Sequence, residues 1–135
     1  MSEHAISNAK GWLSTITGAI AAIALLEEGE EGETVAEFDG ETFTYVDDVR
    51  QRIHEMPLSV LIRDGWRQPG ERGEPAEFEI LLSTGGPALR IYGDIGGEPF
   101  LQWQDWGTPW TTYHDTTGEE DEALRAFTNH FYFEE

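Results

Sequence analysis

The fold class is set by residues 58–114, LSVLIRDGWRQPGERGEPAEFEILLSTGGPALRIYGDIGGEPFLQWQDWGTPWTTYH. Clusters of Gly and Pro divide this stretch into five β-prone runs. The runs cover 58–66, 77–83, 88–95, 99–106 and 110–114. Alternation places the apolar residues of the first four runs on one face: Leu58, Val60 and Ile62, then Phe78, Ile80 and Leu82, then Leu89, Ile91 and Ile95, then Leu101 and Trp103. Successive runs with short connections predict a five-stranded antiparallel meander.

Toward the N-terminus, apolar residues recur at three- and four-residue steps and predict a helix over 3–28. Its stripe consists of Trp12, Ile16, Ile20, Ile23 and Glu27, widened by Leu13, Ala24 and Leu26. The other face is formed by Ser14, Thr15, Ala19, Ala21 and Ala22. These small residues allow close packing either on the domain's own sheet or on a second copy of the helix. Residues 27–33, EEGEEGE, then form an acidic linker.

A hairpin is predicted next, because Asp39-Gly40 lies between two short β-prone runs. A two-residue loop pairs Phe38 with Glu41 and Ala36 with Phe43. One face of this hairpin would then carry Ala36, Phe38, Phe43 and Tyr45.

Two shorter helices complete the chain. Asp47 is predicted to cap the first one, whose stripe is Val46, Val49, Ile53 and Met56 and which Pro57 closes. Thr117 and Glu120 have the spacing of a capping box and predict a second helix over 118–130. Its buried stripe would be Leu124, Phe127 and Phe131, docked on the sheet.

These elements predict one α+β domain over 1–135, with a helix at 1–28, the acidic linker at 27–33 and an α+β core at 34–135. The apolar content of 39% is enough to bury a core. The absence of Cys excludes disulfides, thiolate metal sites and Cys nucleophiles. The apolar run from Trp12 to Leu26 is shorter than the about 20 residues that span a bilayer. Only Lys10 supplies a positive charge before it, so we expect a cytoplasmic protein without a membrane partner.

Catalytic and metal-binding patterns are weak in this chain. The four histidines, His4, His54, His114 and His130, lie on four different predicted elements, so no metal site is predicted. Ser83 lacks the Gly-x-Ser-x-Gly elbow of a hydrolase nucleophile. The one enzymatic alternative uses Asp94, Asp105 and His114 in a cleft beside the Trp residues. We expect a protein that is not an enzyme and has no cofactor.

The strongest compositional signal is negative charge, with 27 acidic against 8 basic residues and a net charge of −19. Glu27 to Asp48 holds ten acids and no base, and Asp115 to Glu135 holds seven acids against Arg125. One interpretation is a solvated face that confers solubility, or a halophile-like adaptation. The other is that spaced carboxylates imitate duplex phosphates and occupy a basic groove, whereas direct nucleic-acid binding is opposed by repulsion. The predicted partner-binding acids are Glu27, Glu28, Glu30, Glu31, Glu33, Glu37, Asp39, Asp47, Asp48, Glu119, Glu120 and Asp121.

Three tryptophans lie within eight residues, at Trp103, Trp106 and Trp110. Strand parity places Trp103 in the core with Leu101 and places Trp106 on the opposite face. Because Trp is a preferred interface anchor, Trp106 and Trp110 are predicted to contact a partner. The alternative is that they close the end of the sheet.

Residues 56–133 resemble a largely uncharacterised group of short acidic proteins encoded on phages, prophages and other mobile elements. The most specific segments are Gly85-Gly86-Pro87-Ala88 with Arg90, the run from Gln104 to Trp110, and Phe131-Tyr132-Phe133. The resemblance implies a mobile-element setting and gives no catalytic residues. Small, very acidic proteins of that setting are often anti-defence factors, including anti-CRISPR and antirestriction proteins that imitate DNA. Extending that role to this chain is an analogy.

The expected function is therefore inhibition of a host CRISPR effector or restriction enzyme, through a basic surface that normally binds DNA. A structural or regulatory phage protein that forms a homodimer through the N-terminal helix is the non-enzymatic alternative. If the DNA-mimic hypothesis holds, the two acidic segments should adjoin in space.

Overall fold

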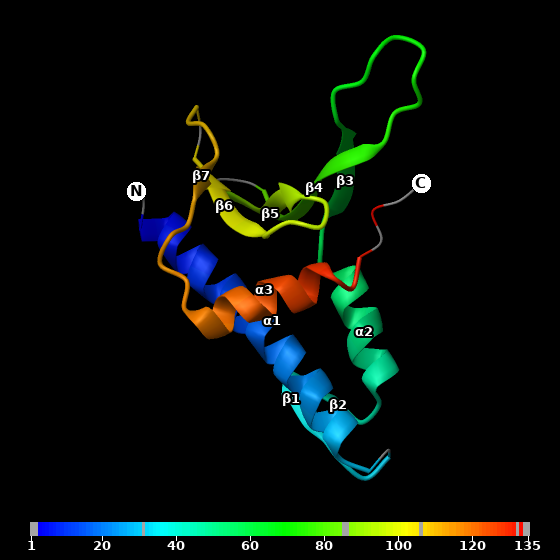
Figure 1. Ribbon diagram of the computed structural model, residues 1–135. Coiled ribbons are helices and arrows are strands. Elements are labelled where there is room, and N and C mark those ends of the chain that lie inside the picture. Colours follow the sequence, from blue (N-terminus) through cyan, green and yellow to red (C-terminus); the bar gives the residue numbers. More distant parts are fainter. Residues whose placement is uncertain (1–2, 31, 85–86, 106, 132, 134–135) are drawn as a thin grey trace.

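Helices and strands follow in the order that the sequence predicts, and the chain has the predicted α+β class (Figure 1). The computed structural model describes residues 3–30, 32–84, 87–105, 107–131 and 133. The elements are α1 Glu3–Glu28, β1 Ala36–Phe38, β2 Glu41–Phe43, α2 Val46–Glu55, β3 Ser59–Asp64, β4 Pro75–Ser83, β5 Ala88–Asp94, β6 Phe100–Gln104, β7 Thr111–Thr112 and α3 Gly118–Thr128.

The five-stranded sheet is an antiparallel meander of strand order β3-β4-β5-β6-β7, which confirms the prediction. Strict alternation along β4, β5 and β6 buries one face of the sheet. The buried residues are Phe78, Ile80, Leu82, Leu89, Ile91, Leu101 and Trp103. All three helices lie on this side of the sheet (Figure 1), so the opposite side forms an outer face that is only partly buried.

Edge strand β3 departs from the predicted pattern. The sequence places Leu58, Val60 and Ile62 on one face, and Val60 and Ile62 do lie opposite the buried Ile80 and Phe78. All three are nevertheless exposed, with exposed fractions of 61%, 39% and 37%. Strand β3 has a neighbour on one side only, and α1 packs beneath β5 and β6 instead. Alternation specifies which side chains share a face, but not whether another element covers that face.

Helix α1 forms the centre of the core and contacts α3, β1 and α2. Its buried residues are Ala5, Ala9, Leu13, Ile16, Ala19, Ala22, Ile23 and Leu26. The predicted packing on the chain's own domain is thus observed, and Ala19 and Ala22 belong to that contact. Ala24 and Glu27 are exposed, so their place in the predicted stripe is wrong. The other residues of the predicted small face do not all join this contact, since Ser14 and Ala21 are exposed.

Within the described part of the chain, α1 is the one helix whose length and mean hydropathy would suit a membrane span. The helical segment is longer than the apolar run that the sequence suggested. A helix buried at the centre of a domain meets the same criteria as a membrane span. Here the buried residues of α1 have packing partners within the domain.

The β1–β2 hairpin has the predicted register, with Ala36 opposite Phe43 and Phe38 opposite Glu41. Asp39 and Gly40 have φ values of 53° and 75°, as a type I′ turn requires. The rings of Phe38 and Phe43 stack, with centroids 4.9 Å apart. Tyr45 was expected on the same buried face but is 47% exposed, because the chain turns into α2 at that point.

The two short helices begin differently. Thr117 caps α3 as predicted: its hydroxyl accepts from the Glu120 amide at 3.1 Å, and the Glu120 carboxylate accepts from the Thr117 amide at 2.9 Å. Helix α2 begins at Val46 after Tyr45, so the prediction that Asp47 is its cap is wrong. Asp47 lies in the first turn, where its charge faces the positive end of the helix dipole.

Candidate functional site

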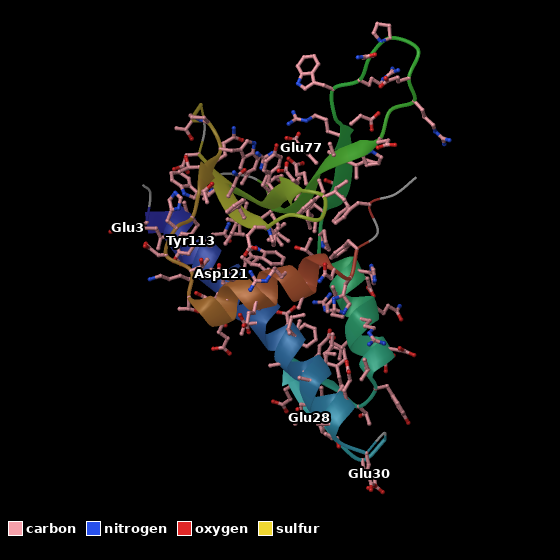
Figure 2. The ribbon with its side chains drawn as sticks, viewed as in Figure 1. Glu3, Glu28, Glu30, Glu77, Tyr113 and Asp121 are labelled. Carbon is pink, nitrogen blue, oxygen red and sulfur yellow. The ribbon has the colours of Figure 1, made fainter. Side chains whose placement is uncertain are left out.

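The acidic segment from Glu27 to Asp48 covers one end of the molecule. It includes the end of α1, the β1–β2 hairpin and the start of α2, and we call it the acidic end. Figure 2 shows Glu28 and Glu30 at this end, remote from the sheet. Every carboxylate that the structure describes between Glu27 and Asp48 is exposed. Glu31, a predicted binding residue, lies outside the described residues.

A hollow of about 550 Å³ opens between the end of α1 and the start of α2. We call it the acidic hollow; its lining is Leu26, Glu27, Gly29, Thr44, Tyr45, Val46, Asp47 and Asp48. Three carboxylates and an exposed phenol ring therefore face one small space. A guanidinium or ammonium group can pair with such carboxylates and pack against the tyrosine ring.

Two arginines of α2 neutralise part of the acidic end. Arg50 lies 3.7 Å from Glu27 and 3.5 Å from Asp47, both lining residues of the acidic hollow. Arg52 is 2.8 Å from Asp39 and 3.9 Å from Glu41. Exposed pairs of this kind contribute little stability, at most about 1 kcal/mol each. A cation from a partner can therefore displace Arg50 at small cost.

Other carboxylates of the acidic end have no ion pair within the residues that the structure describes. They are Glu28, Glu30, Glu33, Glu37 and Asp48. Their charges are directed into solvent and repel one another. These five residues supply most of the uncompensated charge at this end.

The second predicted cluster has a different role. Glu120 takes part in the capping box, and the carboxylate of Asp121 accepts a hydrogen bond of 2.7 Å from the Thr116 hydroxyl. Glu119 is exposed and lies in the same first turn of α3, where acids favour the helix. Figure 2 shows Asp121 near Tyr113, apart from Glu28 and Glu30. The expectation that the two acidic segments adjoin is therefore wrong.

Of the two predicted tryptophan anchors, the structure describes Trp110, which does not lie at the acidic end. Trp106 is outside the described residues. Trp110 is half-buried, and the guanidinium of Arg90 lies 4.2 Å from its ring centroid and 4.3 Å from that of Tyr92. Arg90 also donates to Glu79 at 2.6 Å and to Gln102 at 2.9 Å. Trp110 is thus part of a stacked and hydrogen-bonded cluster on the outer face of the sheet.

A second polar group on the outer face joins β3, β4 and β5. Arg63 pairs with Glu77 and donates to the Tyr92 hydroxyl at 3.1 Å. Hydrogen bonding by Tyr92 and then by Arg63 lowers the pKa of Glu77, and the same carboxylate raises the pKa of Tyr92. These contacts pair the charges of Arg63 and Glu77 with each other within the protein itself.

Sequence reasoning missed the most exposed aromatic side chain that the structure describes. Trp66 follows β3 and is fully exposed, at 106% of its reference area. It begins a loop that projects away from the body between β3 and β4 (Figure 1). The available signal was its setting, RDGWRQPGERG, in which charged residues, Gly and Pro replace any apolar alternation.

The enzymatic alternative is not supported by the geometry. Ala88 at the start of β5 pairs with Gln104, whereas Asp94 ends the strand, so Asp105 and Asp94 lie at opposite ends of the sheet. Six residues of extended strand separate them by about 20 Å. A hollow of about 760 Å³ beside the N-terminal half of α1 contains none of Asp94, Asp105 and His114. In the described residues, no group of three or more His, Asp or Glu side chains could hold a metal ion.

Comparison with known proteins gives no relative for this chain: no protein family model, no curated protein and no solved structure matches it. Its function is therefore inferred from the surfaces described above.

Proposed function

We propose that this protein is a non-enzymatic inhibitor that places its acidic end on a basic, DNA-binding surface of a host defence protein. The main support for this proposal is the acidic end, where exposed carboxylates surround a hollow whose lining includes Glu27, Asp47, Asp48 and Tyr45. The resemblance to acidic proteins of mobile elements suggests a CRISPR effector or a restriction enzyme as the target. Such a target would be met in the cytoplasm of the host cell.

The physical basis is competition for cationic side chains. A protein surface that binds duplex DNA presents Lys and Arg toward phosphates spaced about 1.7 Å per charge along the axis. The carboxylates of Glu28, Glu30 and Glu33 form no ion pair with any described residue and offer charges of the same sign as phosphates. Arginine side chains of the target would enter the acidic hollow and replace Arg50 beside Glu27 and Asp47. Binding at the acidic end then excludes DNA from the same groove.

The proposed binding site contains fewer residues than the sequence predicted. Glu120 and Asp121 already accept hydrogen bonds that stabilise the start of α3, so they are not assigned to the interface. Trp110 is covered on one ring face by Arg90 and is not assigned either. The proposed site consists of the acidic end and the acidic hollow.

The test uses a panel of purified CRISPR effector complexes and restriction enzymes, with DNA binding by each measured in the presence of this protein. We expect inhibition of at least one target, and inhibition should weaken steeply as salt rises from about 0.05 M to about 0.5 M because screening shortens the range of the charges. The triple variant Glu28→Gln, Glu30→Gln, Glu33→Gln should lose at least about tenfold in affinity.

A matched control removes the same number of charges elsewhere. Glu3→Gln, Glu119→Gln, Glu122→Gln changes exposed acids within the first five residues of α1 and α3. This variant should keep nearly all of the inhibition. Equal losses in the two triple variants would mean that net charge alone acts, and the assignment of the acidic end would be wrong.

A further inference from the structure

The sheet has an edge with an unusual composition for such an acidic protein. In the described residues no strand pairs with the outer edge of β3. The strand and the residue before it expose Leu58, Val60, Leu61 and Ile62, with Leu61 57% exposed on the outer face. Arg63 and Asp64 bring the net charge of β3 to zero. Exposed apolar edges of this kind are templates for pairing with another strand.

The usual protections of an edge strand are missing along most of β3. Ser59 to Arg63 pairs with β4 in uninterrupted register, and the irregularity lies only between Arg63 and Asp64. No Pro or Lys interrupts the strand. Its side chains are apolar on both faces, since Val60 and Ile62 point to the helical side and Leu61 to the other. In a single copy of the chain, the apolar side chains of this strand therefore stay exposed and its outer edge has no described partner strand.

We infer that β3 pairs with β3 of a second copy of this chain, in antiparallel register centred on Leu61. A symmetric antiparallel pair requires a two-fold axis perpendicular to the sheet, so directly opposite residues share a face. Centring on Leu61 sets Leu61 against itself, Val60 against Ile62, and Ser59 against Arg63. Two five-stranded sheets then join into one of ten strands, with both helical layers on the same side.

The neighbouring symmetric registers are less favourable. Centring on Ile62 sets Leu61 against Arg63 and Val60 against Asp64, which buries charge beside apolar groups. Centring on Val60 brings Pro57, which has no amide proton, into the paired segment. The Leu61 register matches apolar residues with one another on both faces at its centre and sets an apolar residue against a charge only at its ends, where Leu58 lies opposite Asp64. This self-complementarity is the reason to assign a second copy as the occupant.

One further feature fits this arrangement. The acidic end lies at the opposite extreme of the molecule from β3 (Figure 1), so pairing keeps the two most repulsive regions apart. The dimer is independent of the proposed function, because it uses neither the acidic end nor the acidic hollow.

The first test is sedimentation of the full chain from about 10 μM to about 1 mM, in low and high salt. We expect a concentration-dependent dimer that strengthens with salt, because salt screens the repulsion between two chains of charge −19. This is the reverse of the salt effect expected for target binding. A chain that stays monomeric at every concentration in both salts overturns the inference, and pairing with a foreign strand would then be the remaining use of this edge.

The register is tested by cross-linking, since the chain has no native Cys. Leu61→Cys should form a disulfide-linked dimer under mild oxidation, because opposite residues of an antiparallel pair lie within disulfide range. Ser59→Cys is the matched control: its two copies would be about 13 Å apart. A mixture of Ser59→Cys and Arg63→Cys should cross-link. Equal cross-linking of Cys at 59 and at 61 overturns the register.

A charge exchange at the same position separates pairing from folding. Leu61→Lys sets like charges opposite each other and should weaken the dimer at least about tenfold. Mixing Leu61→Lys with Leu61→Glu should restore a heterodimer. Circular dichroism verifies that both variants fold, as expected for a side chain that is 57% exposed. Failure of the mixture to associate, with both variants folded, overturns the inference.

Discussion

The two acidic segments of this protein look alike in sequence and differ in structure. At the start of α3, Glu120 and Asp121 accept hydrogen bonds from Thr117 and Thr116, so their charges stabilise the fold. At the acidic end, Glu28 and Glu30 are exposed and form no ion pair with any described residue. Density of acidic residues therefore does not identify a binding surface. The informative question is whether each carboxylate already has a partner inside the chain.

The net charge of the chain also differs from the charge that is left free to bind a partner, because some carboxylates are already held in ion pairs. Five arginines hold carboxylates in ion pairs: Arg50, Arg52, Arg63, Arg90 and Arg125. Three of these, Arg63, Arg90 and Arg125, bind carboxylates away from the acidic end. The sheet side of the molecule is thereby closer to neutrality than the net charge of −19 suggests. A partner that responds to charge would meet the acidic end first.

The largest expected effect concerns the helix that supports the acidic end. Ile53 of α2 is 0% exposed, so Ile53→Ala should lower the free energy of unfolding by about 2–5 kcal/mol. Urea denaturation at low protein concentration measures this loss. The matched change Ile62→Ala on β3 removes the same atoms from a side chain that is 37% exposed, and it should cost clearly less, about 1 kcal/mol. Equal costs would mean that β3 belongs to the core of the single chain.

A smaller effect compares the two acidic segments directly. Thr117→Ala removes the capping box of α3 and should destabilise the fold by about 1 kcal/mol. Glu28→Gln should change stability by no more than about 0.5 kcal/mol, because its carboxylate has no ion-pair partner among the described residues. Both are measured as shifts of the urea midpoint. If Glu28→Gln proved as destabilising as Thr117→Ala, the distinction between free and engaged acids would fail.

Local signals allowed much of the fold to be predicted. Asp39-Gly40 specified the hairpin register, and Thr117 with Glu120 specified the start of α3, because these features depend on a few neighbouring residues. The sheet order followed from short connections between consecutive strands. The start of α2 was misassigned because Asp47 and Asp48 suit both a cap and a first turn, and only the backbone decides between them.

Features that depend on tertiary neighbours could not be predicted in the same way. Val60 and Ile80 have the same alternation, but Ile80 is buried between two strands and the helices, whereas Val60 lies at the edge. The hydrogen bond of Asp121 and the stacking of Arg90 on Trp110 depend on side-chain positions that spacing does not encode. The acidic hollow likewise requires the end of α1 to meet the start of α2.

The smallest effect tests whether the acids at the start of α3 act within the chain. Burial raises the pKa of Tyr113, and the charges of Asp115 and Glu120 raise it further. A neutral Tyr113 thus stabilises the fold below the ordinary tyrosine pKa of about 10, and this contribution is lost as pH rises through the higher pKa of the folded state. The free energy of unfolding should therefore decline in that alkaline range. The free energy of unfolding of the Tyr113→Phe variant should decline less over the same range.

Asp115→Asn isolates the electrostatic part of this effect. Removing that charge should lower the pKa of Tyr113 toward its ordinary value, while burial keeps it raised, and tyrosinate absorbance of the folded protein measures the change. Glu28→Gln serves as the control, since Glu28 lies apart from Tyr113 (Figure 2) and should leave the titration unchanged. If both substitutions changed the pKa of Tyr113 equally, that pKa would be set by the net charge of the whole chain and not by the neighbouring carboxylates. The local role of the α3 acids, and with it the contrast between the two acidic segments, would then have to be abandoned.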